Sequence, residues 1–274
     1  MADLESILAF ITDIAEQAGD LIVELRAHNQ LNHDYKQGIE LVTNADVAAD
    51  KLITQAIRER FPDHQILAEE SNPDFSSIEM SDTPLWVIDP IDGTVNYARH
   101  HLQVAISIAY VVKGKIQVAL VYNPFLAEMF TAIRHSGAWL NDQPIRCSQT
   151  LDLKKSLIAT GFPYDKSKHL PQLMAQLTSV LENCADVRRI GSAAIDLCWV
   201  ALGRLDGYYE TVSPWDCAAG WLIAKEAGAK CGYFKTPHGG VKHELHSENL
   251  LVTNPNIHDA LKHVLNQADP EYSI

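Results

Sequence analysis

Residues 85–97 read LWVIDPIDGTVNY, an apolar run followed at once by two aspartates, a glycine and a threonine. The apolar residues 85–88 predict a strand that is buried on both faces. We expect this strand to end at Asp89 and Asp92 to follow in a turn around Pro90, because Asp-Pro and Asp-Gly are common turn signatures. Carboxylates at the end of a buried strand can line a ligand site. The stretch therefore predicts a functional site mounted on a rigid strand.

Four further acidic side chains occupy comparable positions at the ends of predicted elements. An aspartate at a helix start is usually an N-cap, and a pair of glutamates is usually a solvated strand end, so each alone is weak evidence. Three or more carboxylates that converge without histidine or cysteine suit a hard cation such as Mg²⁺ or Mn²⁺. The four are Glu69 and Glu70 after a predicted strand, and Asp46 and Asp216 at the starts of predicted helices.

Glycines beside predicted helix starts add candidate anion sites. Gly93 allows a ligand to approach the backbone closely and, if a helix starts here, the N–H groups of Gly93 and Thr94 would face a phosphate. The Thr94 hydroxyl could also orient a water molecule. Gly191, Ser192 and Ala193 open another predicted helix, where plain helix capping is an equally good explanation.

The composition limits the function classes. The 274 residues are 47% apolar, enough for one large domain or two intimate subdomains, and they carry a formal net charge of −13. That charge argues against binding of nucleic acid or anionic membranes, and an anionic substrate would need metal cations in between. Five cysteines without CxxC spacing predict reduced thiols in a cytoplasmic protein. Without a basic leader or a long apolar run, neither export nor a membrane span is expected.

Hydrophobic periodicity predicts a layered α/β architecture. Apolar residues with helical spacing predict helices at about 4–25 and 46–60, and strand-like runs between 104 and 133 predict an antiparallel meander. A break near residue 150 would separate an N-terminal α+β subdomain with the metal-binding motif, 1–150, from a C-terminal α/β subdomain, 151–274, the two forming one compact catalytic unit. The other predicted elements are a loop or hairpin at 28–43, a loop at 71–83, strands at 65–68, 156–160, 187–190, 206–210 and 250–253, and helices at 170–183, 192–202, 216–227 and 256–266.

These motifs together resemble the inositol monophosphatase family over essentially the whole chain. WVIDPIDGTVNY (86–97) looks like the first family signature, and PWDCAAGWLIAKEAGA (214–229) looks like the second. The resemblance implies the layered α-β-α-β-α sandwich of the sugar-phosphatase type, inhibition by lithium and a homodimer. Further segments that fit in the family's order are VTNAD (42–46), AEES (68–71), YNPFLAEMFTA (122–132), GFPY (161–164) and RRIGSAAIDLCWVALGRLDGYYE (188–210).

Carried over by position, the resemblance implies a cluster of two or three Mg²⁺ ions, which Mn²⁺ could replace. Glu69, Asp89 and the carbonyl group of Ile91 would bind one ion. Asp89, Asp92 and Asp216 would bind a second, and Glu69 would help to hold a third.

The resemblance also implies which residues act on water and substrate. The implied catalytic residues are Glu69, Thr94 and Asp46, with Asp46 behind Thr94 as it positions the attacking water. One departure concerns Glu210: the stretch from Glu210 to Asp216 is one residue shorter than usual in the family and lacks the common glycine, which leaves polyol selectivity open. The implied substrate contacts are Asp92, Gly93, Thr94, Gly191, Ser192, Ala193, Glu210, Asp216 and Lys36, the last on a loop that closes over the metals in relatives.

The implied activity is Mg²⁺-dependent hydrolysis of a phosphomonoester, with myo-inositol 1-phosphate as the default substrate and myo-inositol and phosphate as products. Bound cations would explain how an acidic protein accepts an anionic substrate. The same metal core leaves fructose 1,6-bisphosphate, histidinol phosphate, 3′-phosphoadenosine 5′-phosphate and NADP open as substrates. A regulatory scaffold whose activity is secondary also stays open, although the complete carboxylate set argues against pure scaffolding.

Overall fold

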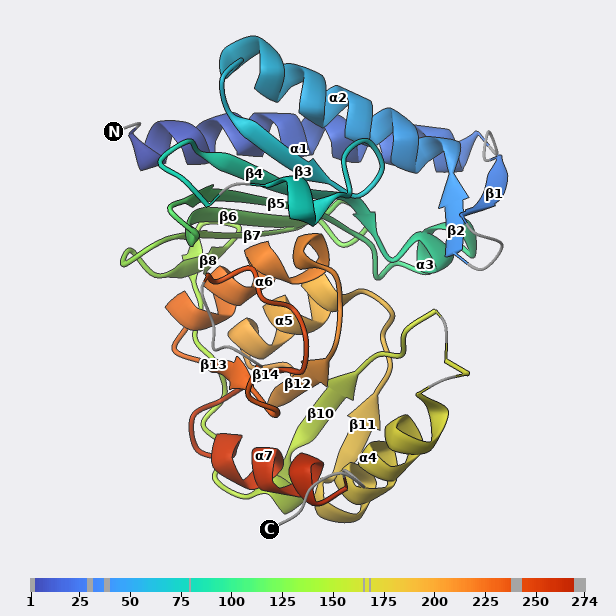
Figure 1. Ribbon diagram of the computed structural model, residues 1–274, viewed down its shortest axis with the longest axis vertical. Helices are drawn as coiled ribbons and strands as arrows, with labels where there is room; N and C mark the ends of the chain where they lie inside the picture. Colours follow the sequence, from blue (N-terminus) through green and yellow to red (C-terminus); the bar gives the residue numbers. More distant parts are fainter. Residues whose placement is uncertain are drawn as a thin grey trace.

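The computed structural model describes residues 3–28, 32–36, 40–78, 80–164, 166–167, 169–237 and 243–268. Figure 1 shows layers of helix and sheet that alternate from one end of the molecule to the other: helices, a sheet, helices, a second sheet and helices again. The predicted α-β-α-β-α sandwich is therefore confirmed.

Two long helices form the outermost layer on one side. α1 (Leu4–Ala27) buries an apolar stripe with helical spacing, as predicted, and α2 (Asn44–Arg60) packs beside it. In the chain segment that joins the two helices, β1 (His33–Lys36) and β2 (Glu40–Thr43) pair antiparallel. The hairpin alternative for this polar segment is confirmed for the described residues.

The larger sheet lies under α1 and α2 and contains the strand that carries Asp89 and Asp92. Within the described residues its strands follow the order β3-β4-β5-β6-β7-β8-β9. β3 and β4 run parallel, while every later neighbour is antiparallel, so the predicted meander is confirmed. The strands are β3 (Gln65–Ala68), β4 (Leu85–Asp92), β5 (Ala105–Val112), β6 (Lys115–Asn123), β7 (Glu128–Ile133), β8 (Ala138–Leu140) and β9 (Gln143–Pro144).

Strand β4 is longer than predicted and contains a bulge. The strand includes all of Leu85–Asp92, so the expected strand end at Asp89 and turn at Asp92 are wrong. Between Asp89 and Asp92 the register advances three residues on β4 but two on β5. The extra residue accommodates Pro90, which cannot donate to the ladder. Residues three apart in a regular strand face opposite sides, so the bulge is what turns both aspartates to one side.

The second sheet mixes parallel and antiparallel pairing. Within the described residues its order is β11-β10-β12-β14-β13. β10 runs parallel to both neighbours, whereas β14 runs antiparallel to both of its own. Sequence reasoning missed β13, a short edge strand whose residues KCGY do not alternate clearly. The strands are β10 (Leu157–Thr160), β11 (Asp186–Arg188), β12 (Gly207–Glu210), β13 (Lys230–Tyr233) and β14 (Leu250–Thr253).

Helices α5 (Ala193–Leu202) and α6 (Pro214–Glu226) fill the layer between the sheets. Both helices are apolar on nearly every side because sheets cover them from above and below. Gly220 lets them approach closely, since a Cβ there would lie 2.6 Å from the Cβ of Leu197. One apolar cluster includes side chains from before and after residue 150, and the predicted division there stays a prediction.

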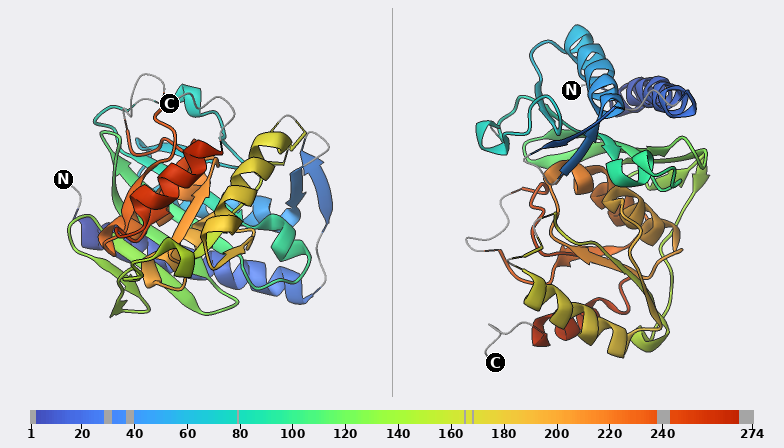
Figure 2. Two further views of the ribbon diagram at one scale, coloured as in Figure 1. Left: turned by 90° about the horizontal axis from the view of Figure 1, so that it is seen from below. Right: turned by 90° about the vertical axis from the view of Figure 1, so that its right-hand side faces the viewer.

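Helices α4 (Leu170–Asn183) and α7 (His258–Gln267) cover the outer face of the second sheet. Figure 2 shows them side by side beneath its strands. Short helical turns complete the chain: α3 (Thr94–Ala98) directly after β4, and the 3₁₀ turns η1 (Phe75–Ser77) and η2 (Leu153–Lys155). No helix in the described part of the chain combines the length and apolar character needed to cross a membrane.

Two helices begin earlier than predicted, and this changes the role of their aspartates. α2 begins at Asn44 with Thr43 as its N-cap, and α6 begins at Pro214 with Ser213 as its N-cap. The expectation that an aspartate begins each helix is therefore wrong. Asp46 and Asp216 each occupy the third helical position, from which a carboxylate reaches back to the N-cap backbone.

Candidate metal and phosphate site

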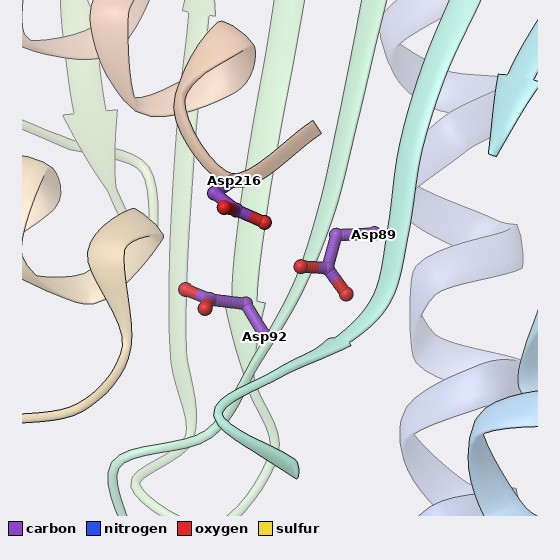
Figure 3. Close-up of side chains that lie close together, drawn as sticks. All are labelled: Asp89, Asp92 and Asp216. Atoms are coloured by element: carbon purple, nitrogen blue, oxygen red, sulfur yellow. The ribbon is translucent and has the colours of Figure 1, made fainter. Parts of the chain in front are cut away.

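Three aspartates meet where β4 faces the first turn of α6 (Figure 3). Carboxylate oxygens of Asp89, Asp92 and Asp216 lie within 4.8 Å of one another. Asp89 is 1% exposed and Asp92 is 8% exposed. Carboxylates at this depth must be paired, protonated or bound to a cation. The structure thus brings together three of the predicted metal ligands, and Ile91 lies between two of them in the bulge.

Glu69 joins this aspartate cluster through the pairing of β3 with β4. The parallel register sets Ala68 beside Ile88, so the next residues of the two strands, Glu69 and Asp89, are neighbours. The Glu69 N–H donates to the Ile88 carbonyl oxygen at 3.2 Å. The carboxyl groups of Glu69 and Asp89 also share a hydrogen bond. A fourth predicted ligand is therefore adjacent to the cluster.

Burial and like charges shift the whole cluster toward protonation. Burial is the largest cause of the raised pKa of Asp89, and the charges of Glu69, Asp92 and Asp216 add to it. Burial also raises the pKa of Asp216 and brings that of Asp92 to about 6, although hydrogen bonds from Ser192 and the backbone oppose it there. Buried carboxylates this close together repel one another unless protons or a cation lie between them. A divalent cation would supply that compensation, so this all-oxygen set fits Mg²⁺ or Mn²⁺.

Thr94 is held between β4 and α2. Its hydroxyl oxygen lies 2.9 Å from Oδ1 of Asp46 and 3.2 Å from the Ile91 carbonyl oxygen. A hydroxyl has one proton, and the nearer carboxylate is the stronger acceptor. Asp46 in turn accepts at Oδ2 from the N–H and the hydroxyl of Thr43, at 2.8 and 2.6 Å. With its proton directed at Asp46, the Thr94 oxygen is left to accept a hydrogen bond from a water molecule.

Gly93 and Gly191 bring the two predicted phosphate-contacting segments together. Both residues have positive φ, at 96° and 90°, and Gly93 directly precedes α3, so the helix start considered from the sequence is present. A Cβ at Gly93 would lie 3.1 Å from the carbonyl oxygen of Gly191. Asn96 links the segments because its Nδ2 donates to the Ile190 carbonyl oxygen at 2.9 Å. A side chain at residue 93 would strain the backbone and push the segments apart.

The start of α5 holds a carboxylate of the cluster. The Ser192 hydroxyl donates to Oδ2 of Asp92 at 2.6 Å, and the Ala194 N–H donates to the same oxygen at 2.7 Å. Ser192 is also the N-cap of α5, so capping is present at this segment together with the contact to Asp92. The N–H groups at this helix start therefore orient Asp92, and contact of Gly191, Ser192 and Ala193 with substrate stays a prediction.

Glu210 ends β12 at the margin of the cluster. The Tyr208 hydroxyl donates to its Oε2 at 2.7 Å, and burial raises the pKa of Glu210 to about 7. The charge of Glu210 contributes to the raised pKa of Asp216, so the two carboxylates share one environment. Sequence reasoning missed Tyr208, although strand alternation places residues 208 and 210 on the same face. The side chain of Lys36, another predicted substrate contact, lies outside the described residues.

Sequence reasoning also missed Asp196, a buried aspartate of α5. It is 1% exposed, and its Oδ1 has no hydrogen-bond partner among the described residues. Burial raises its pKa well above the usual range, and the charges of Glu210 and Asp92 add to the effect. A carboxyl group in this position is best accommodated in its neutral form. The signal in the sequence was a single aspartate within the apolar run AAIDLCW.

Comparison with known proteins identifies the family. The model of the inositol monophosphatase family matches residues 3–269, and the chain belongs to this family. A relative from Pasteurella multocida, named Nus factor SuhB, is 39% identical over 259 residues, which are 93% of each chain. The inositol-1-monophosphatase of Synechocystis is 40% identical over 274 residues, covering 99% of this chain and 92% of the relative.

A solved structure supports the same assignment. The inositol monophosphatase from Anabaena superposes with a TM-score of 0.83 at 35% identity and covers 98% of both chains. The family resemblance that the sequence suggested is therefore confirmed, and the fold, the family and the acidic cluster together support a metal-dependent phosphatase. The relatives carry two kinds of name, one for an enzyme and one for a Nus factor.

Proposed function

We propose that this protein hydrolyses phosphomonoesters with two or three Mg²⁺ ions, which Mn²⁺ could replace, bound at the aspartate cluster. The observation that carries the proposal is the convergence of three carboxylates beside Glu69 in a chain of the inositol monophosphatase family. Glu69, Asp89 and the Ile91 carbonyl group would hold one ion. Asp89, Asp92 and Asp216 would hold a second, and Glu69 would contribute to a third.

The chain's own groups would place water and substrate around the ions. When bound, Mg²⁺ supplies Lewis-acid polarisation of the phosphate and a lowered pKa for water. Thr94, oriented by Asp46, accepts a hydrogen bond from the attacking water and aligns it. The N–H groups of Gly93 and Thr94 face the phosphate at the start of α3. Glu210 accepts a hydrogen bond from a hydroxyl group of the leaving alcohol.

We propose myo-inositol 1-phosphate as the substrate to test first. The name of the Synechocystis relative and the position of Glu210 beside the cluster support this choice. Fructose 1,6-bisphosphate, histidinol phosphate, 3′-phosphoadenosine 5′-phosphate and NADP are the alternatives, since a shared metal core leaves the alcohol to be selected by surrounding residues.

The test is phosphate release from this panel of esters with Mg²⁺, with a chelator and with Li⁺. We expect turnover that requires Mg²⁺, stops with the chelator and is inhibited by Li⁺. Asp89→Asn should abolish turnover and leave the circular dichroism spectrum unchanged. The matched control is Asp142→Asn at an exposed aspartate, which should retain full activity. Wild-type turnover in Asp89→Asn would contradict the proposed metal site.

A role as a regulatory partner protein is a second candidate, favoured by the name Nus factor SuhB carried by a relative. Failure of the wild-type protein to hydrolyse any ester, while Mg²⁺ still raised its melting temperature, would favour this role over catalysis. We further propose a cytoplasmic homodimer. Its solution mass, measured by light scattering, should be twice the 30.4 kDa of the chain.

A further inference from the structure

A cavity of about 400 Å³ opens beside Glu210, at the ends of β10 and β12. Its other walls come from α4 and from residues 234–237, which follow β13. A cavity of this size accommodates a ligand larger than a single hydroxyl group in contact with Glu210. Among the residues of the proposed reaction, Glu210 is the one that the cavity shares. The rest of the cavity has no part in the chemistry described above.

Gln176 of α4 gives this cavity a buried hydrogen-bonding group. Its side chain lines the cavity and is 5% exposed. No hydrogen bond joins its amide to any other residue that the structure describes. Its amide atoms are not among the fully enclosed unpaired atoms of the described residues, so the amide opens on the cavity, where buried polar groups need a partner. The amide of Gln176 can therefore both donate to and accept from a group that enters the cavity.

The remaining walls favour an uncharged ring. Tyr209 and Phe234 pack edge to face with ring centroids 6.4 Å apart, and they form an apolar wall together with Leu173. Charged side chains of both signs also line the cavity, with Glu248 and Glu210 against Lys235. Among the described residues, His169 and Lys235 are the basic groups of this lining, and two carboxylates accompany them, which is not the concentration of positive charge that a second phosphate group requires. A ring with hydroxyl groups matches both the apolar wall and the free amide.

Glu210 stands between this cavity and the aspartate cluster. Along β12, Tyr208 points toward the layer of α5 and α6, while Tyr209 points the opposite way, toward α4 and α7. Glu210 follows at the strand end, where it both lines the cavity and contributes to the raised pKa of Asp216. Glu210 thus belongs both to the cavity wall and to the surroundings of the cluster, and a substrate that occupied both sites would have to pass this side chain.

We propose that this cavity is a leaving-group subsite for phosphomonoesters whose alcohol carries a second, uncharged, hydroxylated ring, and that Gln176 binds that ring. The inference rests on the proposed phosphatase function. Glu210 accepts from a hydroxyl group of the phosphorylated ring, and the second ring lies against Tyr209 and Phe234. Substrate selection is then determined by α4 as well as by the residues around the metal ions.

The test compares trehalose 6-phosphate with glucose 6-phosphate, which share the phosphorylated ring and differ by one glucosyl ring. We expect wild-type kcat/KM to be about tenfold higher for trehalose 6-phosphate. Gln176→Leu should remove that advantage through KM, because about tenfold corresponds to one hydrogen bond to a ligand. It should leave glucose 6-phosphate unaffected. Thr178→Ala, on the exposed face of the same helix, is the matched control and should change neither ester.

Equal wild-type kcat/KM for the two esters, or an equal loss for both in Gln176→Leu, would overturn the subsite. If Gln176→Leu fails to fold, Gln172→Leu one turn earlier on the cavity wall gives the same readout. If no ester is hydrolysed, the phosphatase proposal fails, and binding of trehalose itself decides the subsite separately. Saturation-transfer NMR should then show contact with trehalose that is lost in the glutamine variant, and absence of contact with the wild-type protein would overturn the inference.

Discussion

The starts of α2 and α6 are built alike but face different surroundings. In each helix the aspartate at the third position accepts a hydrogen bond at Oδ2 from the N-cap N–H, from Thr43 to Asp46 and from Ser213 to Asp216, both at 2.8 Å. This arrangement satisfies one of the N–H groups that a helix start leaves unpaired. Locally, the two aspartates are equivalent.

The groups opposite each aspartate make the difference. Both oxygens of Asp46 accept from hydroxyl groups, those of Thr94 and Thr43, so its carboxylate is fully used in orienting neighbours. Asp216 faces Asp89 and Asp92, which offer no donor unless a proton or a cation is present. A capping aspartate thus becomes an orienting residue at α2 and a candidate metal ligand at α6 because of what the fold sets against it.

Asp216→Asn should give the largest effect. We expect turnover to fall by roughly 10³-fold, since a proposed ligand to the ions that stabilise the transition state is lost. Metal-free stability should stay constant or rise, because one of three mutually repelling carboxylates is removed. Initial rates and thermal melts with and without Mg²⁺ measure both. An undiminished Mg²⁺-induced rise in melting temperature would show that Asp216 does not bind the metal.

Asp46→Asn should reduce turnover by about 10–100-fold while the Mg²⁺-induced rise in melting temperature persists. The amide has one acceptor oxygen, and with that oxygen on the Thr43 N–H its NH₂ group faces Thr94, which loses its orientation while the start of α2 keeps its cap. Thr94→Val tests the connection, since adding it to Asp46→Asn should cost little more than either change alone. If Mg²⁺ no longer raised the melting temperature of Asp46→Asn, Asp46 would be needed for metal binding, and its proposed difference from Asp216 would be wrong.

Gly161→Ala should leave both aspartates intact and disturb Glu210. A Cβ at residue 161 would collide with the Glu210 carboxylate. We expect KM to rise by about three- to tenfold with kcat nearly unchanged, because Glu210 is proposed to bind the leaving alcohol and not the phosphate. Steady-state kinetics with inositol 1-phosphate measure this. A fall in kcat alone would place Glu210 in the chemical step instead.

His258 should affect stability alone, since it lies on α7 away from the cluster. Burial lowers its pKa to about 4, and its Nδ1 lies 3.1 Å from the Thr253 hydroxyl oxygen. The unfolded chain, with a histidine pKa of about 6.5, binds the proton first. Stability should therefore fall by about 1 kcal/mol per pH unit as pH drops from about 6 to 5. Urea titrations at several pH values should show that the free energy of unfolding falls less steeply with decreasing pH in His258→Gln than in the wild-type protein. Equal pH dependence in the two proteins would show that His258 is not the cause.

Much of the fold could be predicted because its signals are local. The apolar stripe of α1 and the punctuated runs of β5, β6 and β7 repeat with the period of their own element, whatever packs against them. The end of β4 could not be predicted in this way. Its Asp-Pro and Asp-Gly pairs are turn signals, yet pairing with β5 keeps the segment in the sheet through a bulge.

The candidate site likewise contains residues that could be predicted from the sequence and residues that could not. The carboxylates stood out because acidic residues interrupt apolar runs, and the family resemblance related them to one another. The groups that orient them did not stand out. Ser192 reaches Asp92 across 100 residues of sequence, and Thr94 reaches Asp46 across 48. In the sequence, Gln176 is indistinguishable from other polar residues of an amphipathic helix. Its place in the cavity wall follows from the packing of α4 against the second sheet.

By itself, the sequence determined most of the element types, the family and the carboxylates proposed as ligands, because residue type and spacing carry that information along the chain. The tertiary structure alone decided how those carboxylates are used. The bulge in β4 turned Asp89 and Asp92 to one side, and the layer of α5 and α6 brought Asp216 to meet them. The physical reason is that the groups within a few ångströms of a carboxylate determine its pKa, its burial and whether its oxygens remain available to a cation. Those groups come from distant parts of the chain.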